Sequence, residues 1–433
     1  MLMQQREYRR DVQAVAFLSQ ANQTALNPTA QQLDDHLQAL GLSRTDGKNG
    51  TATPASEDPT QLSFAEIQPI LQSYLRSQRQ ANQDGLLPLP NDLQQYLAQP
   101  PVQQRLDELE QFILSQPLPT WELEVEQLIR SQPGPSFFPI AHLQRLLLAR
   151  SLARGLKPSD YDSSLRQSRS ASVSANQPVA ADPSLEAAWR LSEAIAARPD
   201  LLSQMLAGIL QQQQLTLLRH LDLYQTEMDN GRWQQRLAQN QQQALFQALT
   251  FDQWAEYRAQ QRRSNPNFAP SFPGHPFNQM FSQPLLKFSR LDWLAARQRN
   301  QQQLRASVLC DRNSTPAALT VTPHPLNPFG SGEISIFSQE WIKASDRMLS
   351  AELTQKVIEA KAIARRQQQW PKQLDNLESS VCPGLSWKYQ RTPEGGIELG
   401  FDQVPHWRIG ITSDFSPLQY RAPALETAIS SNN

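Results

Sequence analysis

The sequence predicts a mainly α-helical protein: an irregular multi-helix bundle or solenoid-like body, followed by a small C-terminal module of one helix plus a β-hairpin. Three observations predict this fold class. Apolar residues recur at helical spacing in most of the periodic segments. Glutamine, which has good helix propensity and no charge, accounts for 57 of the 433 residues. Near the C-terminus, two alternating segments flank a Gly-containing turn.

Changes in composition and periodicity divide the chain. Polar segments rich in Gly, Pro and Ser separate the helical ones, and we interpret them as linkers or inserts. The expected divisions are N-terminal helices at 1–42, a linker at 43–60, a helical region at 61–158, a low-complexity insert at 159–183, a helical repeat-like region at 184–305 with a Pro/Phe-rich loop at 264–285, an irregular segment at 306–344, and a long helix plus β-hairpin module at 345–425.

Local signals support the helices of the first helical region. Ser63 and Glu66 form a capping-box pattern, in which side chains satisfy free amides at a helix start. A further helix is expected over residues 139–155, because one side of it is almost entirely apolar. We expect the other side to be solvated by its arginines, Arg145, Arg150 and Arg154.

The most informative helix carries a residue pattern at 187–199. Asp182 is a suitable N-cap for this helix and Pro183 a suitable first residue, and Pro199 is expected to end it. Small residues on one face allow a neighbouring helix to approach closely, and a larger apolar residue fills the space between them. These face residues are Ala187, Leu191 and Ala194.

This pattern has the spacing of the second helix of a tetratricopeptide hairpin. The chain resembles uncharacterised bacterial helical proteins with a degenerate tetratricopeptide-like unit, in which residues 143–155 are the first helix and 185–199 the second. It departs from that pattern because a long insert separates the two helices. Our leading hypothesis is a non-catalytic helical scaffold that binds another protein in a groove lined by Trp189, Leu191, Arg198, Arg219 and Tyr224.

The C-terminal module is expected to begin with a helix over residues 345–369. Strands are expected at 385–390 and 397–401, and residues 407–411 are a candidate third strand. Residues 361–377 are similar to an element of some envelope proteins and pseudopilins, in which a long helix ends in an aromatic-Pro turn before strands. That similarity keeps a cell-envelope assembly factor as an alternative and implies no catalytic residues.

The sequence contains no assembled catalytic signature. No two of the six histidines stand at helical metal-ligand spacing, and no phosphate loop or dinucleotide fingerprint is present, so we expect neither metal nor cofactor. We interpret the acidic residues near 122–126 as a solvated face rather than a glycosidase pair. The enzyme alternative is a hydrolase whose site assembles from loop residues such as His275, His324 and Ser331.

Two further features bear on partners and compartment. Residues 258–305 contain eight positively charged residues and one acidic residue, interleaved with phenylalanine, and we favour an acidic protein surface over nucleic acid as their partner.

The two cysteines, Cys310 and Cys382, can pair in an oxidising compartment. We favour buried free thiols. No stretch is long and apolar enough to span a bilayer, and the N-terminal residues lack the charged-then-apolar order of a signal peptide. We therefore expect a cytoplasmic location, with the cell envelope as the alternative if an N-terminal anchor has been lost.

Overall fold

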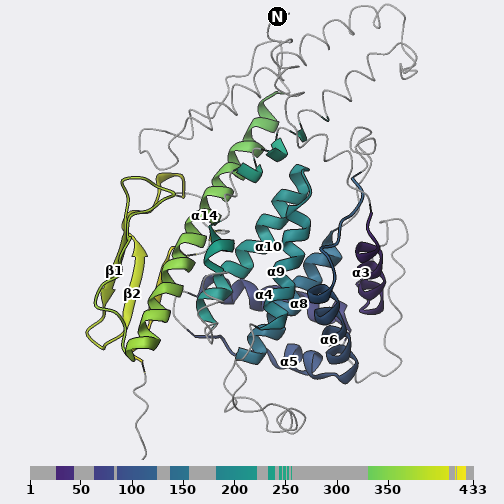
Figure 1. Cartoon of the computed structure of the whole chain (residues 1–433), viewed down its shortest axis with the longest axis horizontal. Coiled ribbons are helices and arrows are strands. Elements are labelled where there is room, and N and C mark those ends of the chain that lie inside the picture. The colour runs from purple at the N-terminus through teal and green to yellow at the C-terminus, as the bar shows by residue number, and fades with distance from the viewer. Residues whose placement is uncertain are drawn as a thin grey trace, which may run out of the picture.

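The computed structural model shows a mainly helical body with a long C-terminal helix and a three-stranded antiparallel sheet, which confirms the predicted fold class. In Figure 1 the long helix α14 lies between the sheet and the other helices. The structure describes residues 26–42, 63–81, 85–123, 137–155, 182–221, 233–238, 243–245, 247–249, 251–252, 255, 330–408, 415 and 417–425.

The helical body comes first in the chain, and the sheet follows α14. The described elements are α3 (Pro28–Ala39), α4 (Phe64–Gln80), α5 (Asn91–Ala98), α6 (Pro100–Ser115), α8 (Phe138–Gly155), α9 (Pro183–Ala196), α10 (Leu201–His220), α14 (Gly330–Gln367), β1 (Trp387–Arg391), β2 (Ile397–Phe401), the 3-10 turn η5 (His406–Arg408) and β3 (Gln419–Ala422).

The predicted helix starts of α4 and α9 are confirmed. The Glu66 carboxylate accepts hydrogen bonds from the Ser63 backbone N–H (2.7 Å) and hydroxyl (2.8 Å), and these bonds lower the pKa of Glu66. At α9, the Asp182 side chain accepts from the Ser184 N–H (2.9 Å), with Pro183 at the first helical position. Both starts follow from side chains that satisfy amides within the first turn.

The face of α9 that was expected to pack against a neighbour is buried. Ala187, Leu191 and Ala194 are each at most 1% exposed, and α9 contacts α6, α8 and α10. Small side chains on this face permit close helix packing, as the sequence pattern indicated. Trp189 completes the burial through an edge-to-face contact with Trp233, with ring centroids 5.2 Å apart.

The arginines of α8 differ from the expectation of a solvated face. Glu110 of α6 is 4% exposed, and its carboxylate lies 3.1 Å from Arg150 and 3.2 Å from Arg154. Arg154 also lies 3.1 Å from Asp182, the N-cap of α9. A buried carboxylate requires cationic partners. These two arginines therefore hold α6, α8 and the start of α9 together.

Helix α14 begins at Gly330, so residues 330–344 are helical where the sequence predicted an irregular segment. Intrinsic propensity does not explain this start, because residues 330–332 are Gly-Ser-Gly. Tertiary packing explains it instead, because Trp341 and Ala344 are 4% and 0% exposed and form an apolar cluster with Leu245 and Leu249. The remainder of the expected irregular segment, 306–329, lies outside the described residues.

The predicted hairpin is confirmed, and a third strand completes the sheet. β2 pairs antiparallel with both neighbours, so that Leu399 is opposite Tyr389 on β1 and Tyr420 on β3. The turn contains Gly395 at a φ of 85°, a backbone conformation that favours glycine. The candidate third strand at 407–411 is not confirmed, because residues 407–408 belong to η5 and 409–411 lie outside the described residues. The third strand that the structure describes forms at 419–422.

The cysteine expectation is also corrected. Cys382 is buried and disulfide-bonded, which contradicts the favoured free thiol. The chain has one other cysteine, Cys310, which lies outside the described residues. The sequence alone could not decide this point because pairing depends on which segments meet in space.

A buried polar cluster joins α10 to α14 and to the chain before β3. The Arg219 guanidinium, 2% exposed, donates to Thr354 Oγ1 (2.9 Å), the Ser350 carbonyl (2.8 Å) and the Pro417 carbonyl (3.3 Å). Lys361 Nζ donates to the Arg219 carbonyl (2.7 Å). His220 lies beside this cluster, and burial together with the charges of Lys361 and Arg219 lowers its pKa to about 3.

We predict that His220 makes the protein less stable in mild acid. An unfolded histidine titrates near 6.5, so as the pH falls below that value the unfolded state takes up a proton that the folded state excludes. Between pH 7 and pH 5, this group should lower the free energy of unfolding by about 2 kcal/mol. In His220→Gln the loss over that interval should shrink by a similar amount in denaturant titrations. An equal loss in both proteins would contradict the prediction.

Candidate functional site

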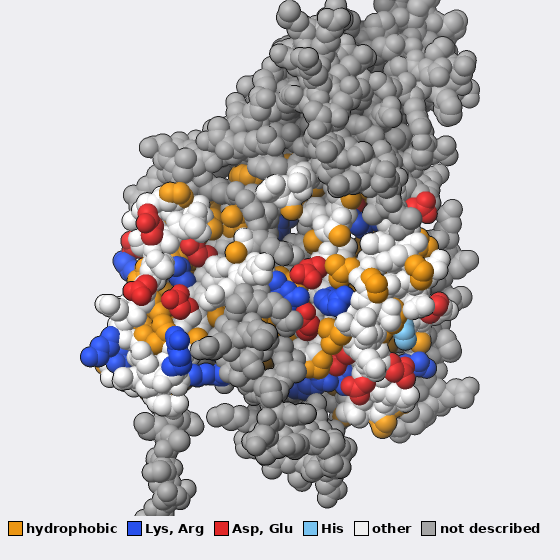
Figure 2. Space-filling model, viewed as in Figure 1, with side chains coloured by type: hydrophobic (Ala, Val, Ile, Leu, Met, Phe, Trp, Pro, Cys, Tyr) orange, Lys and Arg blue, Asp and Glu red, His pale blue; other side chains and the backbone are white. Residues whose placement is uncertain are grey.

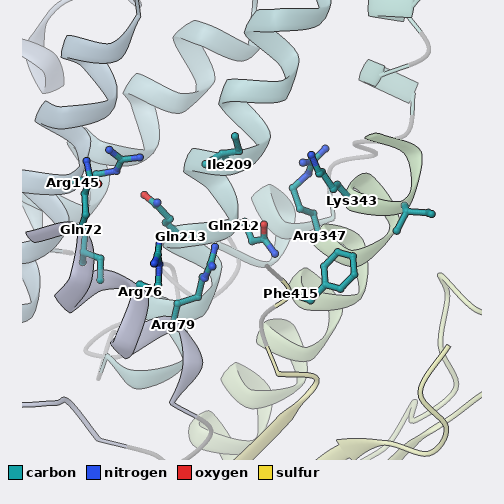
Figure 3. A pocket seen from close by; sticks show the side chains of 12 residues that line it. Gln72, Arg76, Arg79, Arg145, Ile209, Gln212, Gln213, Lys343, Arg347 and Phe415 are labelled. Atoms are coloured by element: carbon teal, nitrogen blue, oxygen red, sulfur yellow. The ribbon is translucent and has the colours of Figure 1, made fainter. Parts of the chain in front are cut away.

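A pocket of about 500 Å³ opens between α4, α8, α10 and α14 (Figure 3). Its wall is strongly basic, and none of the described residues that line it is an aspartate or glutamate. The cationic residues are Arg76, Arg79, Arg145, Lys343 and Arg347. The remaining lining consists of three amides, Gln72, Gln212 and Gln213, and four apolar side chains, Leu75, Ile209, Ile342 and Phe415.

Helix α4 supplies two of the arginines from adjacent turns. Arg76 and Arg79 are three residues apart and therefore lie on one face, and Figure 3 shows both rising from α4 toward Gln213. Buried apolar side chains next to the arginines hold the helix in place, because Leu71 and Leu75 are at most 4% exposed. The position of the two guanidinium groups thus follows from the burial of the apolar face of α4.

Arg145 enters the pocket from α8, the helix whose apolar side forms much of the core. Burial lowers its pKa from the ordinary arginine value, which means that its charge is partly desolvated without full compensation. Within the described parts of the chain, neither Arg145 nor Arg76 forms an ion pair with a carboxylate. Their positive charges are therefore directed at the pocket.

Arg347 of α14 is the most deeply buried cation of the wall, at 4% exposed. Its guanidinium occupies the space that a side chain at Gly208 would take: a Cβ built there would lie 2.5 Å from Arg347 Cζ. Burial lowers the pKa of Arg347, whereas the carboxylates of Glu340 and Asp346 raise it. The absence of a side chain at Gly208 thus determines where this guanidinium can lie.

Asp346 holds the adjacent turn of α14 against its neighbours. Its carboxylate is 2.6 Å from Arg408 and accepts from the Gln212 amide at 3.0 Å. Burial raises the pKa of Asp346 to about 6, and the surrounding arginines oppose that shift. Lys343, one turn earlier, is paired with Glu340 at 2.7 Å. The α14 side of the pocket is therefore oriented by contacts behind its wall.

The wall is suited to binding an anion. Guanidinium groups present several N–H donors in a plane that matches carboxylate and phosphate groups. A concave site with charges of one sign concentrates counter-ions, and its volume falls within the range of ligand sites. Among the described lining residues there is no histidine, carboxylate, serine or cysteine.

The residues predicted to line a protein-binding groove lie elsewhere. Four of them, Trp189, Leu191, Arg198 and Arg219, are buried, with exposures of 2%, 0%, 5% and 2%. Arg198, for example, is paired with Asp200 at 3.1 Å. They pack inside the body and are not at the surface in this structure. The fifth, Tyr224, lies outside the described residues.

The residues of the hydrolase alternative are not brought together in the part of the chain that the structure describes. Ser331 lies in the first turn of α14 instead of a loop, and His275 and His324 lie outside the described residues. The basic segment 258–305 also lies outside them.

Among the described residues, no group of three or more His, Cys, Asp or Glu residues is arranged to hold a metal. Within the same residues, no helix combines the length and apolar content that a bilayer span requires.

Comparisons with known proteins do not assign the chain to a family. The chain matches no family model, no curated protein and no solved structure. The structure supports the coarse statement of a mainly helical protein, and the tetratricopeptide resemblance stays a prediction.

We predict that Gly208→Ala displaces the Arg347 guanidinium from its place against α10. Alanine favours helix over glycine by about 1 kcal/mol, which should offset part of the cost of that shift, so the fold should be retained. Inorganic pyrophosphate serves as a small polyanionic probe of the basic pocket, and we expect it to raise the thermal unfolding temperature of the unmodified protein. That increase should be smaller in Gly208→Ala. Gly155→Ala is the control, because its added methyl meets only the side-chain ends of Leu86 and Leu221, at 3.1 Å. The same response in both variants would contradict the role of Gly208.

Proposed function

We propose that this protein is a non-catalytic helical scaffold that binds another protein, and that the basic pocket binds acidic side chains of that partner. The observation that carries this proposal is the convergence of five cationic side chains on a wall without a carboxylate. Cations held close together repel one another, and burial also desolvates Arg145 and Arg347 and lowers their pKa. A bound anion relieves both costs.

The construction of the pocket supports recognition by a rigid surface. Every cationic residue of the wall stands on a helix, and the helices that carry them pack directly against one another, α4 on α8 and α10, and α10 on α14. The packed helices hold the Cα positions of these residues at fixed spacing, so a ligand can bind without a backbone rearrangement. The α8–α9 pair, with its tetratricopeptide-like spacing, is in keeping with a scaffold role.

The distribution of charge favours a protein partner over nucleic acid. On the face shown in Figure 2, blue and red side chains are interspersed over the described surface, with apolar side chains between them. Nucleic acid is bound by extended basic surfaces that contact many phosphates. A basic pocket beside a face of mixed charge suits a few acidic side chains of another protein.

The proposal predicts binding of a fluorescent oligo-glutamate peptide that weakens with salt. Removing two pocket charges in Arg76→Gln/Arg145→Gln should weaken binding about tenfold, since exposed or half-buried charge pairs contribute up to about 1 kcal/mol each. Fluorescence anisotropy at several salt concentrations measures both effects.

The control removes the same charge elsewhere. Arg105 on α6 and Arg391 on β1 are outside the pocket and exposed, so Arg105→Gln/Arg391→Gln should bind the peptide as the unmodified protein does. Equal weakening in the two double variants would indicate non-specific attraction and refute the pocket as the binding site.

The disulfide favours the cell-envelope alternative for where this scaffold acts. Cys382 is disulfide-bonded, and structural disulfides persist in oxidising compartments and are rare in the cytosol. We therefore propose an extracytoplasmic location over the cytoplasmic one. Alkylating free thiols in denaturant at the moment of cell lysis, followed by mass spectrometry, should show Cys382 protected until a reductant is added. Immediate alkylation of Cys382 would overturn this location.

A further inference from the structure

Helix α10 exposes a row of apolar side chains that leads into the basic pocket. Leu202 is 70% exposed and Ile209 is 44% exposed. Met205 and Leu206 between them are half-buried. Spacings of three, four and seven residues place all four side chains along one face of the helix. We call these four residues the α10 row.

The α10 row and the basic pocket share a residue. Ile209 ends the row and also lines the pocket, beside Gln212 and Gln213 on the same helix (Figure 3). The distance along α10 from Leu202 to Ile209 is about 10 Å, from a rise of 1.5 Å per residue. The combined surface is therefore apolar at the start of α10 and cationic two turns later.

We propose that the partner segment is an amphipathic helix, with its apolar face along the α10 row and acidic side chains at one end in the basic pocket. This inference rests on the proposed function and names the chemistry of the partner. Amphipathic helices bind apolar surfaces through side chains at positions i, i+3, i+4 and i+7, which is the spacing of the row itself. Charge complementarity places the acidic end of the segment at the pocket.

The shape of the surface favours a helix over a membrane. Exposed apolar side chains beside cations also occur on proteins that bind anionic lipid. Here, however, the cations line a concave pocket, and Arg347 is only 4% exposed. A flat layer of headgroups would contact the rim, whereas acidic side chains that project from a helix reach the wall.

The test compares two synthetic peptides of about 18 residues, long enough to form a helix. The first has leucines at i, i+3, i+4 and i+7 and glutamates at one end; the second has the same composition with the leucine spacing scrambled. The full-length protein should bind the first about tenfold more tightly in fluorescence anisotropy, because only that peptide buries its leucines on the α10 row.

Variants locate the contact. Leu202→Gln should reduce binding of the first peptide about tenfold, and Ile209→Gln is a second variant with the same expected effect. Phe138→Gln is the matched control, because Phe138 is 69% exposed on α8 and lies outside the row and the pocket. Leu202 is largely exposed, so the fold should survive, and circular dichroism checks this.

Each alternative occupant has its own result. If both peptides bind equally and Arg76→Gln/Arg145→Gln weakens both, the pocket binds acidic groups without a helix, which overturns this inference and leaves the proposed function standing. If neither peptide binds, the result overturns both this inference and the proposed function. Binding to phosphatidylserine vesicles that Leu202→Gln abolishes, without peptide binding, would identify a membrane surface. Self-association that Leu202→Gln abolishes would identify a second copy of this chain as the occupant of the α10 row. Vesicle binding or self-association of this kind would each overturn the inference.

Discussion

Arg219 of α10 lies at the boundary between the helical body and the C-terminal module, with its guanidinium buried among Thr354, Ser350 and the Pro417 carbonyl. Hydrogen bonds to a buried charge are worth about 1.5 to 3 kcal/mol each, and a charge that loses them bears the full cost of desolvation. Sliding α14 along α10 would break the bonds to Thr354 and Ser350 together, and moving the chain before β3 would break the bond to Pro417. This one side chain therefore contributes to the relative positions of all three elements.

The pocket is a consequence of that arrangement. With α14 held at this register, Arg347 lies against Gly208 and Lys343 stands one turn away, so that both reach the same space as the arginines of α4 and α8. Asp346 orients the same turn from behind through Arg408 and Gln212. Packing contacts that stabilise the fold therefore also position the cations of the candidate site.

Signals carried by neighbouring residues predict the local structure correctly. The capping box at Ser63, the Asp182–Pro183 start of α9 and the hairpin around Gly395 each depend on contacts within a few residues. In contrast, the periodicity of α8 indicated a polar face and could not show that Arg150 and Arg154 meet Glu110, some 40 residues earlier. The start of α14 was missed because distant packing, not propensity, extends that helix.

By itself, the sequence determined the fold class, the capped helix starts and the β-hairpin, because these follow from periodicity and short-range hydrogen bonds. Tertiary structure decided which polar residues are buried and which face a partner. Arg76 and Arg79 are recognisable as a pair on one helix, yet nothing near them in the chain indicates that Arg145 and Arg347 join them. Those residues come together only after four helices pack, since the electrostatic environment of a side chain depends on all the elements around it.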